Sequence, residues 1–119
     1  MATILVVEDE PNLRLLYRME LEDEGYDIIE ATEGREALTK VSTHCPDLVV
    51  LDLMMPGMDG IDTLWRILGL NAEMPVIVHS CYEALKDNYM TWVANDFVDK
   101  SSDLAPLKQA ISGILNESA

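Results

Sequence analysis

A short apolar run that ends on a single carboxylate is the feature that most constrains the fold of this chain. Residues Leu48 to Leu51 are all apolar, which is typical of a strand buried on both faces of a parallel sheet. Asp52 follows at once, and two turn dipeptides, Pro56-Gly57 and Asp59-Gly60, come shortly after it. Open α/β sheets bind their ligands at the carboxyl ends of their strands. An unpaired buried carboxylate is too costly for a packing role, so Asp52 is a candidate functional group that needs a cation or donors beside it.

The same alternation of an apolar run and a helical pattern recurs along the chain. The expected strands are residues 4–7, 26–31, 48–51, 76–79 and 97–98. The expected helices lie within residues 11–24, 33–43, 59–68, 82–92 and 103–115. Five strand–helix units with short connections predict an α/β fold, with a doubly wound, five-stranded parallel sheet and helices on both faces.

Side chains at helical spacing define the inner faces and ends of these helices. The first helix begins at Pro11, and Asp59 and Asp103 are the expected N-caps of the third and last helices. The helix over 82–92 is the weakest prediction, because asparagine and threonine lower its propensity. The residues expected on the repeating apolar positions of the first helix are Leu13, Leu16, Tyr17 and Leu21.

Composition and charge limit the kinds of partner that this chain can have. The chain has 119 residues, of which 49% are hydrophobic, so we expect one domain with a real core over residues 1–119 and no output domain. A net charge of −14 argues against nucleic acid or an anionic membrane as a direct partner. No signal peptide and no apolar run near the ~20 residues of a membrane span are visible, so the expected location is cytoplasmic.

Polar residues end four of the expected strands. Because the carboxyl ends of parallel strands meet at one edge, Glu8-Asp9, Asp52, Ser80 and Lys100 are expected to share a site. Carboxylates from Asp9 and Asp52, with Glu8 or Glu10 nearby, suit Mg²⁺ and would repel one another without a cation. Mg²⁺ and a lysine can neutralise a phosphoryl group, a serine can donate to it, and a carboxylate can attack phosphorus.

Each of these residues alone has a more ordinary explanation, as do the histidines, methionines and cysteines. A single serine at such a position is more often a strand-end cap, and a single lysine is more often a solvated surface residue. Only their combination with the acids favours a functional site. His44 and His79 lack partners at metal-ligand spacing, and Met55 and Met58 are expected to fill gaps. Cys45 and Cys81 form no disulfide framework, and free cysteine is usually buried, so neither is expected to carry chemistry.

Four blocks of sequence resemble the receiver domain of two-component response regulators, of the single-domain, chemotaxis-regulator-like kind. The resemblance spans essentially the whole chain, and the block around Asp52 is its most specific part. The blocks are Val6-Val7-Glu8-Asp9-Glu10-Pro11 with Arg14, Asp52-Leu53-Met54-Met55-Pro56-Gly57-Met58-Asp59-Gly60, Pro75-Val76-Ile77-Val78-His79-Ser80 and Asp96-Phe97-Val98-Asp99-Lys100. The resemblance implies a flavodoxin-like fold with strand order 2-1-3-4-5.

The resemblance also implies a role for each matching residue. Asp52 would accept a phosphoryl group from a sensor histidine kinase or a histidine phosphotransfer protein. Glu8, Asp9, Asp52 and the Met54 backbone carbonyl would hold Mg²⁺. Lys100 would pair with the phosphoryl oxygens. Ser80 and Phe97 would act as the switch that rearranges the surface of the fourth helix, fifth strand and fifth helix for a downstream protein target. The protein would be a signalling phosphoacceptor that catalyses only its own phosphorylation and dephosphorylation.

Three departures from the family pattern lie on the signalling side of the site. Ser101 replaces the usual proline after the lysine; because a cis bond there would cost about 2.5–4 kcal/mol, we expect a trans Lys100–Ser101 bond. The switch aromatic is Phe97 rather than tyrosine and so has no hydroxyl. Val93 stands where the family has glycine, and a positive φ would be strained there.

Three alternative functions remain at this point. A haloacid-dehalogenase-like phosphatase also uses an aspartyl phosphate, but it needs an Asp where this chain has Met54. A flavin-binding module would need a Ser/Thr/Gly-rich phosphate loop, where this chain has Glu8-Asp9-Glu10, which repels phosphate. An interaction module of the receiver fold that is no longer phosphorylated would have no reason to keep all the site residues.

Overall fold

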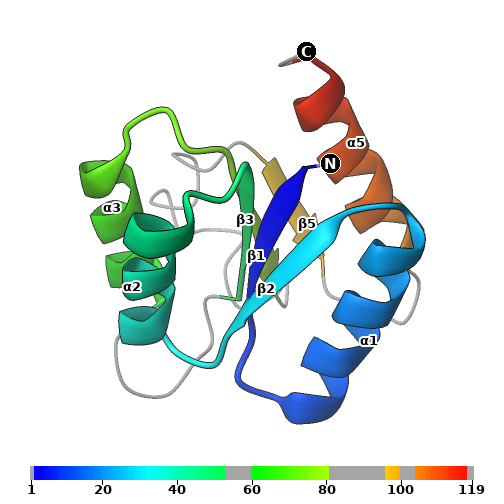
Figure 1. Cartoon of the computed structure of the whole chain (residues 1–119), viewed down its shortest axis with the longest axis horizontal. Coiled ribbons are helices and arrows are strands. Elements are labelled where there is room, and N and C mark those ends of the chain that lie inside the picture. Colours follow the sequence, from blue (N-terminus) through cyan, green and yellow to red (C-terminus); the bar gives the residue numbers. More distant parts are fainter. Residues whose placement is uncertain (1, 53–59, 81–95, 100–103, 118–119) are drawn as a thin grey trace.

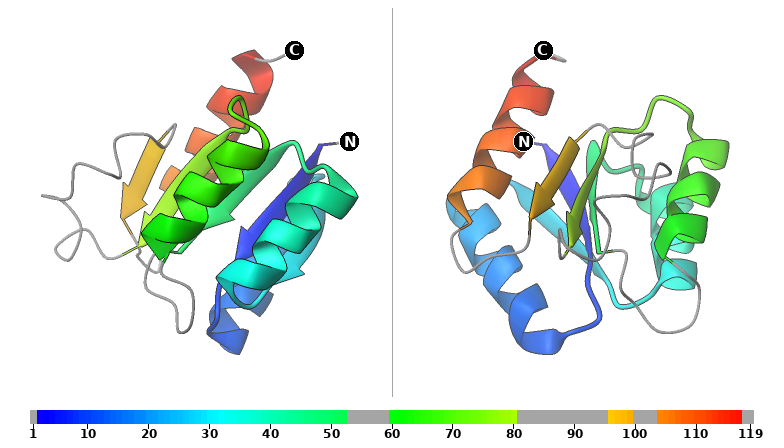
Figure 2. Two further views of the ribbon diagram at one scale, coloured as in Figure 1. Left: turned by 90° about the vertical axis from the view of Figure 1, so that its left-hand side faces the viewer. Right: turned by 180° about the vertical axis from the view of Figure 1, so that it is seen from behind.

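The described part of the chain forms a parallel sheet between two pairs of helices. The structure is a computed structural model that describes residues 2–52, 60–80, 96–99 and 104–117. Along the chain the elements are β1 (Thr3–Val7), α1 (Pro11–Asp23), β2 (Asp27–Ala31), α2 (Gly34–His44), β3 (Leu48–Leu51), α3 (Gly60–Leu70), β4 (Val76–Ser80), β5 (Asp96–Asp99) and α5 (Ala105–Glu117). Helices α1 and α5 cover one face of the sheet, and α2 and α3 cover the other (Figures 1 and 2).

The sheet has the order β2-β1-β3-β4-β5, with all neighbours parallel. This confirms the fold and strand order expected from the sequence. Central strands read as continuous apolar runs because both of their faces are covered. Their carboxyl ends point to the same edge, which is the lower end of the sheet in Figure 1.

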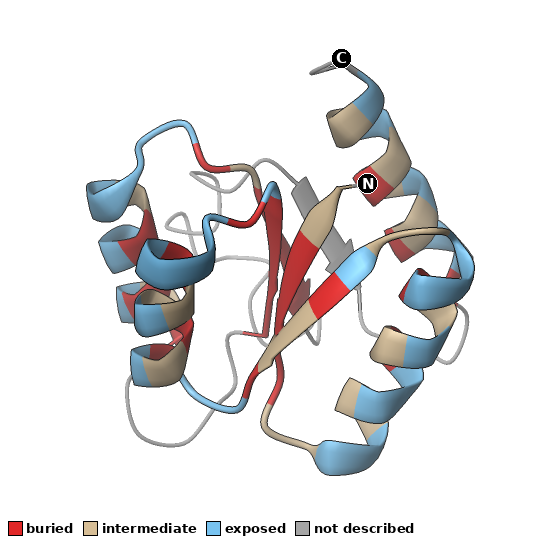
Figure 3. Cartoon of the chain, viewed as in Figure 1, coloured by how far each residue is buried: buried red, intermediate tan, exposed pale blue. Residues whose placement is uncertain are grey.

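Two hydrophobic cores result from the alternation of side chains along each strand. Leu5 and Val7 of β1 belong to the core under α2 and α3, whereas Ile4 and Val6 belong to the core under α1 and α5. Figure 3 shows buried residues on the strands and on the inward faces of the helices. Each core joins elements that are far apart in the sequence, from Leu5 to Val78 in one and from Ile4 to Ile111 in the other, so the sheet is held by long-range packing.

Most element boundaries agree with the sequence prediction to within a few residues, and one face assignment differs. The second strand begins at Asp27 rather than one residue earlier, and α2 is shifted by one residue toward its carboxyl end. Tyr17 and Leu21 of α1 are buried as expected, but Leu16 is exposed. The expected helix over 82–92, the Asp59 and Asp103 caps, and the Lys100–Ser101 bond lie outside the described residues.

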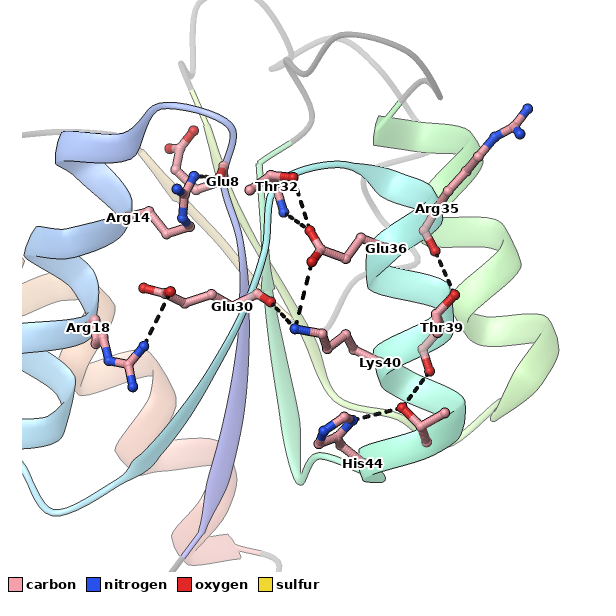
Figure 4. Close-up of polar contacts among 11 residues, drawn as sticks. Glu8, Arg14, Arg18, Glu30, Thr32, Arg35, Glu36, Thr39, Lys40 and His44 are labelled. Carbon is pink, nitrogen blue, oxygen red and sulfur yellow. Dashed lines mark hydrogen bonds and ion pairs between the residues drawn. The ribbon is translucent and has the colours of Figure 1, made fainter.

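The edge strand β2 is protected by charged side chains. The Lys40 ammonium of α2 donates to the backbone oxygen of Glu30 at 2.8 Å, and Arg18 of α1 pairs with the Glu30 carboxylate at 3.2 Å (Figure 4). Charged groups on an edge strand hinder pairing with another chain. No helix in the part of the chain that the structure describes is long and apolar enough to cross a bilayer.

Candidate functional site

The ends of β1, β2 and β3 place two carboxylates side by side. The Glu8 amide donates to the Ala31 carbonyl at the end of β2 (3.0 Å), and the Asp52 amide donates to the Val7 carbonyl at the end of β1 (3.1 Å). These bonds continue the sheet ladder by one residue beyond each regular strand. Glu8 and Asp52 therefore enter the site from adjacent central strands whose backbone positions are held by the sheet.

Glu8, Asp9 and Asp52 form a compact acidic cluster at this edge. Each offers a carboxylate oxygen, and these oxygens all lie within 4.8 Å of one another. Glu8 is 1% exposed and Asp52 is 3% exposed, whereas Asp9 is partly exposed. The sequence prediction that these three acids come together is thus met by the structure.

The donor set and burial of the cluster fit a small divalent cation. Three carboxylates at this separation repel one another, and burial of two of them weakens the screening by water. Mg²⁺ binds through a few carboxylate oxygens and retains several waters, and the partial exposure of Asp9 is consistent with such a hydrated ion.

Glu10 has a different task, although the sequence alone left it as an alternative to Glu8. Its carboxylate accepts hydrogen bonds from the amides of Asn12 (3.2 Å) and Leu13 (2.8 Å), so it is the N-cap of α1. A carboxylate also suits the positive end of the helix dipole. The structure therefore separates the acid run into cluster members and a helix cap.

Arg14 contacts the cluster from the second turn of α1. Its Nη1 donates to the backbone oxygen of Glu8 at 2.9 Å (Figure 4). Sequence reasoning included Arg14 among the family-like residues but assigned it no role. The available signal was its spacing, because a basic side chain about one helical turn after a cap can reach back over the loop that precedes the helix.

The remaining predicted site residues are only partly within the described structure. In the sheet, Leu51 pairs with Val78, and Val78 pairs with Phe97, so Ser80 and Phe97 lie on strands that end at the same edge as Asp52. Their side chains, and all of Lys100 and Met54, lie outside the described residues. The same holds for Val93, Ser101 and Cys81, and the roles predicted for all of these stay predictions.

The two histidines are not members of the acidic cluster. His79 is buried, and its ring packs on that of Tyr17 with 5.2 Å between centroids. This supports its expected structural role. His44 is exposed in the last turn of α2, at the opposite end of the sheet, and its Nδ1 lies 2.7 Å from the Thr43 hydroxyl. Cys45 is exposed, so it departs from the usual burial of free cysteine, and the expectation that it carries no chemistry stays a prediction.

Comparison with known proteins places the sequence and the fold of this chain in one family. Residues 4–112 match the family model described as response regulator receiver domain. The transcriptional regulatory protein TrcR of Mycobacterium tuberculosis is 33% identical over 98% of this chain, which corresponds to 46% of TrcR. The chain thus spans about half the length of such regulators. Sporulation initiation phosphotransferase F of Bacillus subtilis is 35% identical over 87% of this chain and 76% of that protein.

Solved structures agree with the sequence comparisons. The response regulator protein TrrA of Thermotoga maritima, in complex with Mg²⁺-BeF, matches with a TM-score of 0.92 and 37% identity over 96% of this chain and 99% of that chain. A structure of the histidine kinase ThkA in complex with TrrA matches with a TM-score of 0.90 and 37% identity, over 97% of this chain and 99% of that chain. The likeness therefore extends over nearly the whole chain in both sequence and fold. By its family match, its relatives and its fold, the chain belongs to the receiver domains of response regulators.

Proposed function

We propose that Asp52 accepts a phosphoryl group from a histidine of a sensor kinase or phosphotransfer protein in a Mg²⁺-dependent reaction. The observation that carries this proposal is the buried cluster, in which carboxylate oxygens of Glu8, Asp9 and Asp52 lie within 4.8 Å of one another. The complex of ThkA with TrrA supports a histidine kinase as the partner, and the Mg²⁺-BeF complex of TrrA supports the metal.

The transfer needs positioning and charge compensation more than covalent chemistry from other residues. The bond from phosphorus to the histidine nitrogen breaks as a bond from phosphorus to an Asp52 oxygen forms. The imidazole leaves with its electron pair and takes up a proton from water. Glu8, Asp9, Asp52 and the Met54 carbonyl would hold Mg²⁺, which when bound would neutralise the phosphoryl oxygens and the developing charge. Lys100 would pair with the same oxygens.

The signal leaves the site through the strands on the far side of Asp52. Ser80 hydrogen-bonds the phosphoryl group, Phe97 moves inward behind it, and the surface that includes β5 and α5 changes for a protein target. The added charge thereby shifts a two-state element toward one of its states. Related regulators act on transcription, but with a net charge of −14 this chain is proposed to act by protein contact rather than by direct contact with nucleic acid.

A small phosphodonor tests the acceptor role without any partner protein. The chain is incubated with acetyl phosphate, with and without Mg²⁺, and intact mass and hydroxylamine lability are measured. We expect one labile phosphate per chain, only with Mg²⁺, and none in Asp52→Asn. The control Asp27→Asn, at the exposed start of β2 on the opposite sheet edge, should be labelled as the wild type is.

The same experiment distinguishes the two competing functions that the site allows. A phosphatase of the haloacid dehalogenase type would release many phosphates per chain from a phosphate ester, whereas a receiver retains one phosphate for a finite time. An interaction module that is no longer phosphorylated would show no labelling with Mg²⁺. Labelling that persists in Asp52→Asn would place the acceptor elsewhere.

A further inference from the structure

Arg14 holds the backbone between two of the site acids. The Glu8 oxygen that accepts from its Nη1 at 2.9 Å belongs to the peptide unit that joins Glu8 to Asp9. Rotation of that unit would turn the Asp9 side chain relative to Glu8. The guanidinium therefore acts on the one part of the backbone that sets how the two carboxylates face each other.

Two further hydrogen bonds hold the neighbouring peptide units. The Glu8 amide donates to the Ala31 carbonyl at 3.0 Å, and the Glu10 amide donates to Glu8 Oε2 at 3.3 Å. The Arg14 bond lies between these two along the chain. It is made by a side chain that is not a member of the acidic cluster, so it can be removed without removing a carboxylate.

We propose that Arg14 is a positioning residue for the metal, which presents Glu8 and Asp9 to Mg²⁺ by fixing the peptide unit between them. This inference rests on the proposed function. Mg²⁺ demands near-octahedral geometry, so a small error in carboxylate direction lowers its affinity. Groups that orient metal ligands typically contribute about 10–100-fold to metal affinity. Arg14 is partly buried, and its planar fork loses less freedom on bonding than a lysine would.

A charge effect would have the opposite sign, which makes the proposal testable. A guanidinium beside three acids stabilises the metal-free site and opposes Mg²⁺, so its removal would strengthen metal binding if charge dominated. The observed contact is to a neutral peptide oxygen, and we therefore assign the larger effect to geometry. Removal of Arg14 should weaken Mg²⁺ binding.

The experiment compares Arg14→Met, Arg14→Gln and Arg14→Lys in the full chain. The matched control is Arg18→Met, one turn further along α1, where the guanidinium pairs with Glu22 and Glu30 instead. Both methionine variants lose one positive charge. The Mg²⁺ dissociation constant is measured by calorimetry, thermal unfolding is measured without metal, and the rate of labelling by acetyl phosphate is measured at saturating Mg²⁺.

Arg14→Met should bind Mg²⁺ about tenfold more weakly than the wild type. The Mg²⁺ dissociation constant of Arg18→Met should stay within about twofold of the wild-type value, because this variant removes the same charge but no contact to the site. Arg14→Lys should recover most of the affinity that Arg14→Met loses. Unchanged or tighter Mg²⁺ binding by Arg14→Met would overturn the proposal, as would an equal loss in Arg18→Met. If Arg14→Met does not fold, Arg14→Gln, which keeps a donor of shorter reach, decides by the same criterion.

Failure of the proposed function would look different. In that case the wild type itself would bind Mg²⁺ without taking up phosphate, or would not bind Mg²⁺ at all. The wild type could bind Mg²⁺ but take up no phosphate, while Arg14→Met binds Mg²⁺ tenfold more weakly. That result would support the positioning role of Arg14 and reject phosphoryl transfer.

Discussion

Cys45 follows the last turn of α2 with a backbone conformation that suits glycine. Its φ is 46°, in the left-handed region, and its amide donates to the Val41 carbonyl in the manner of a helix C-cap. A side chain with a Cβ pays about 1–2 kcal/mol in that region. Helices commonly end with glycine at this position because glycine avoids that cost.

Replacement of Cys45 by glycine should therefore stabilise the chain relative to replacement by alanine. Both variants remove the exposed thiol, so their difference isolates the backbone conformation. We expect Cys45→Gly to exceed Cys45→Ala by about 1 kcal/mol in the free energy of unfolding, measured in urea. Equal stability of the two variants would show that the left-handed conformation is not retained in solution.

Single residues also show where sequence reasoning stops. The acids at the strand ends could be predicted, because parallel strands must bring their carboxyl ends to one edge. The residues alone left Glu8 and Glu10 as alternatives, and only the family resemblance pointed to Glu8, since the choice depends on which side chain turns back to cap α1. The contact of Arg14 with a backbone oxygen was hidden for a similar reason, because it depends on the path of the loop and not on residue type.

Among the elements, α1 is notable because its outer surface keeps large apolar side chains. Leu15 is 53% exposed and Met19 is 60% exposed, and Leu16 is exposed beside them. This group lies on the helix that begins directly after the acidic cluster. On the proposed function, a partner that delivers a phosphoryl group to Asp52 would dock next to that cluster, so the outer surface of α1 is a suitable contact for it.

The double variant Leu15→Ala, Met19→Ala should slow phosphotransfer from the cognate kinase about tenfold, as expected for loss of two apolar contacts at an interface. Labelling by acetyl phosphate should not change, because the site itself is intact. The matched control is Leu70→Ala on α3, where the side chain is 55% exposed and distant in sequence from the cluster. Equal slowing by Leu70→Ala, or slowing with the small donor, would exclude docking on α1.

The connection from β2 to α2 carries a pH-dependent contact. The Thr32 amide donates to the Glu36 carboxylate at 2.6 Å, and its hydroxyl donates at 3.0 Å. The backbone bond from Thr32 is the main reason that the pKa of Glu36 lies below its ordinary value of 4.5. Lys40, 3.7 Å from the second Glu36 oxygen, lowers this pKa further.

Because its folded-state pKa is lowered, Glu36 adds stability above pH 4.5 and loses it as the pH falls through the lowered pKa. Glu36→Gln should unfold at lower temperature than the wild type at neutral pH. The difference should shrink as the pH is lowered below 4.5 and through the lowered pKa of Glu36. The control is Glu33→Gln, since the Glu33 side chain makes no cap hydrogen bond. A Glu36→Gln difference that does not change with pH would contradict this assignment.

The strands and helices themselves were well predicted from the sequence. Four-residue apolar runs such as Leu48 to Leu51 have no other plausible place than a covered sheet. The prediction erred at Leu16, because helical spacing alone does not show how wide a buried stripe is. The left-handed conformation at Cys45 gave no signal in the sequence, because glycine is the usual residue there.

At the scale of the whole molecule, charge opposes compaction. A net charge of −14 is confined to a body with a radius of gyration of 12.8 Å, and three acids meet at one sheet edge. Self-repulsion of this kind lowers stability and is relieved by salt. A cation bound at the cluster should relieve more of it than a diffuse ion atmosphere does.

Mg²⁺ should therefore raise the unfolding temperature more than NaCl at equal ionic strength. At 100 times its dissociation constant, Mg²⁺ adds about 2.7 kcal/mol if it binds only the folded chain. Asp9→Asn should keep the response to NaCl and lose the extra response to Mg²⁺. Its metal-free form should be more stable by about 1 kcal/mol, the Coulomb energy of two unit charges ~4 Å apart in water. If Mg²⁺ still raised the unfolding temperature of Asp9→Asn as it does that of the wild type, Mg²⁺ would not bind at the cluster.

The bond between the Asp52 amide and the Val7 carbonyl has a consequence for when signalling can begin. Val7 ends β1 and Asp52 follows β3, so the two residues come from different parts of the chain and meet only after β1 and β3 have paired. A nascent or unfolded polypeptide has no such pairing and therefore no assembled acidic cluster that could be phosphorylated. On the proposed mechanism, a kinase can phosphorylate only chains that have already folded. Each phosphorylated receiver is therefore a folded one.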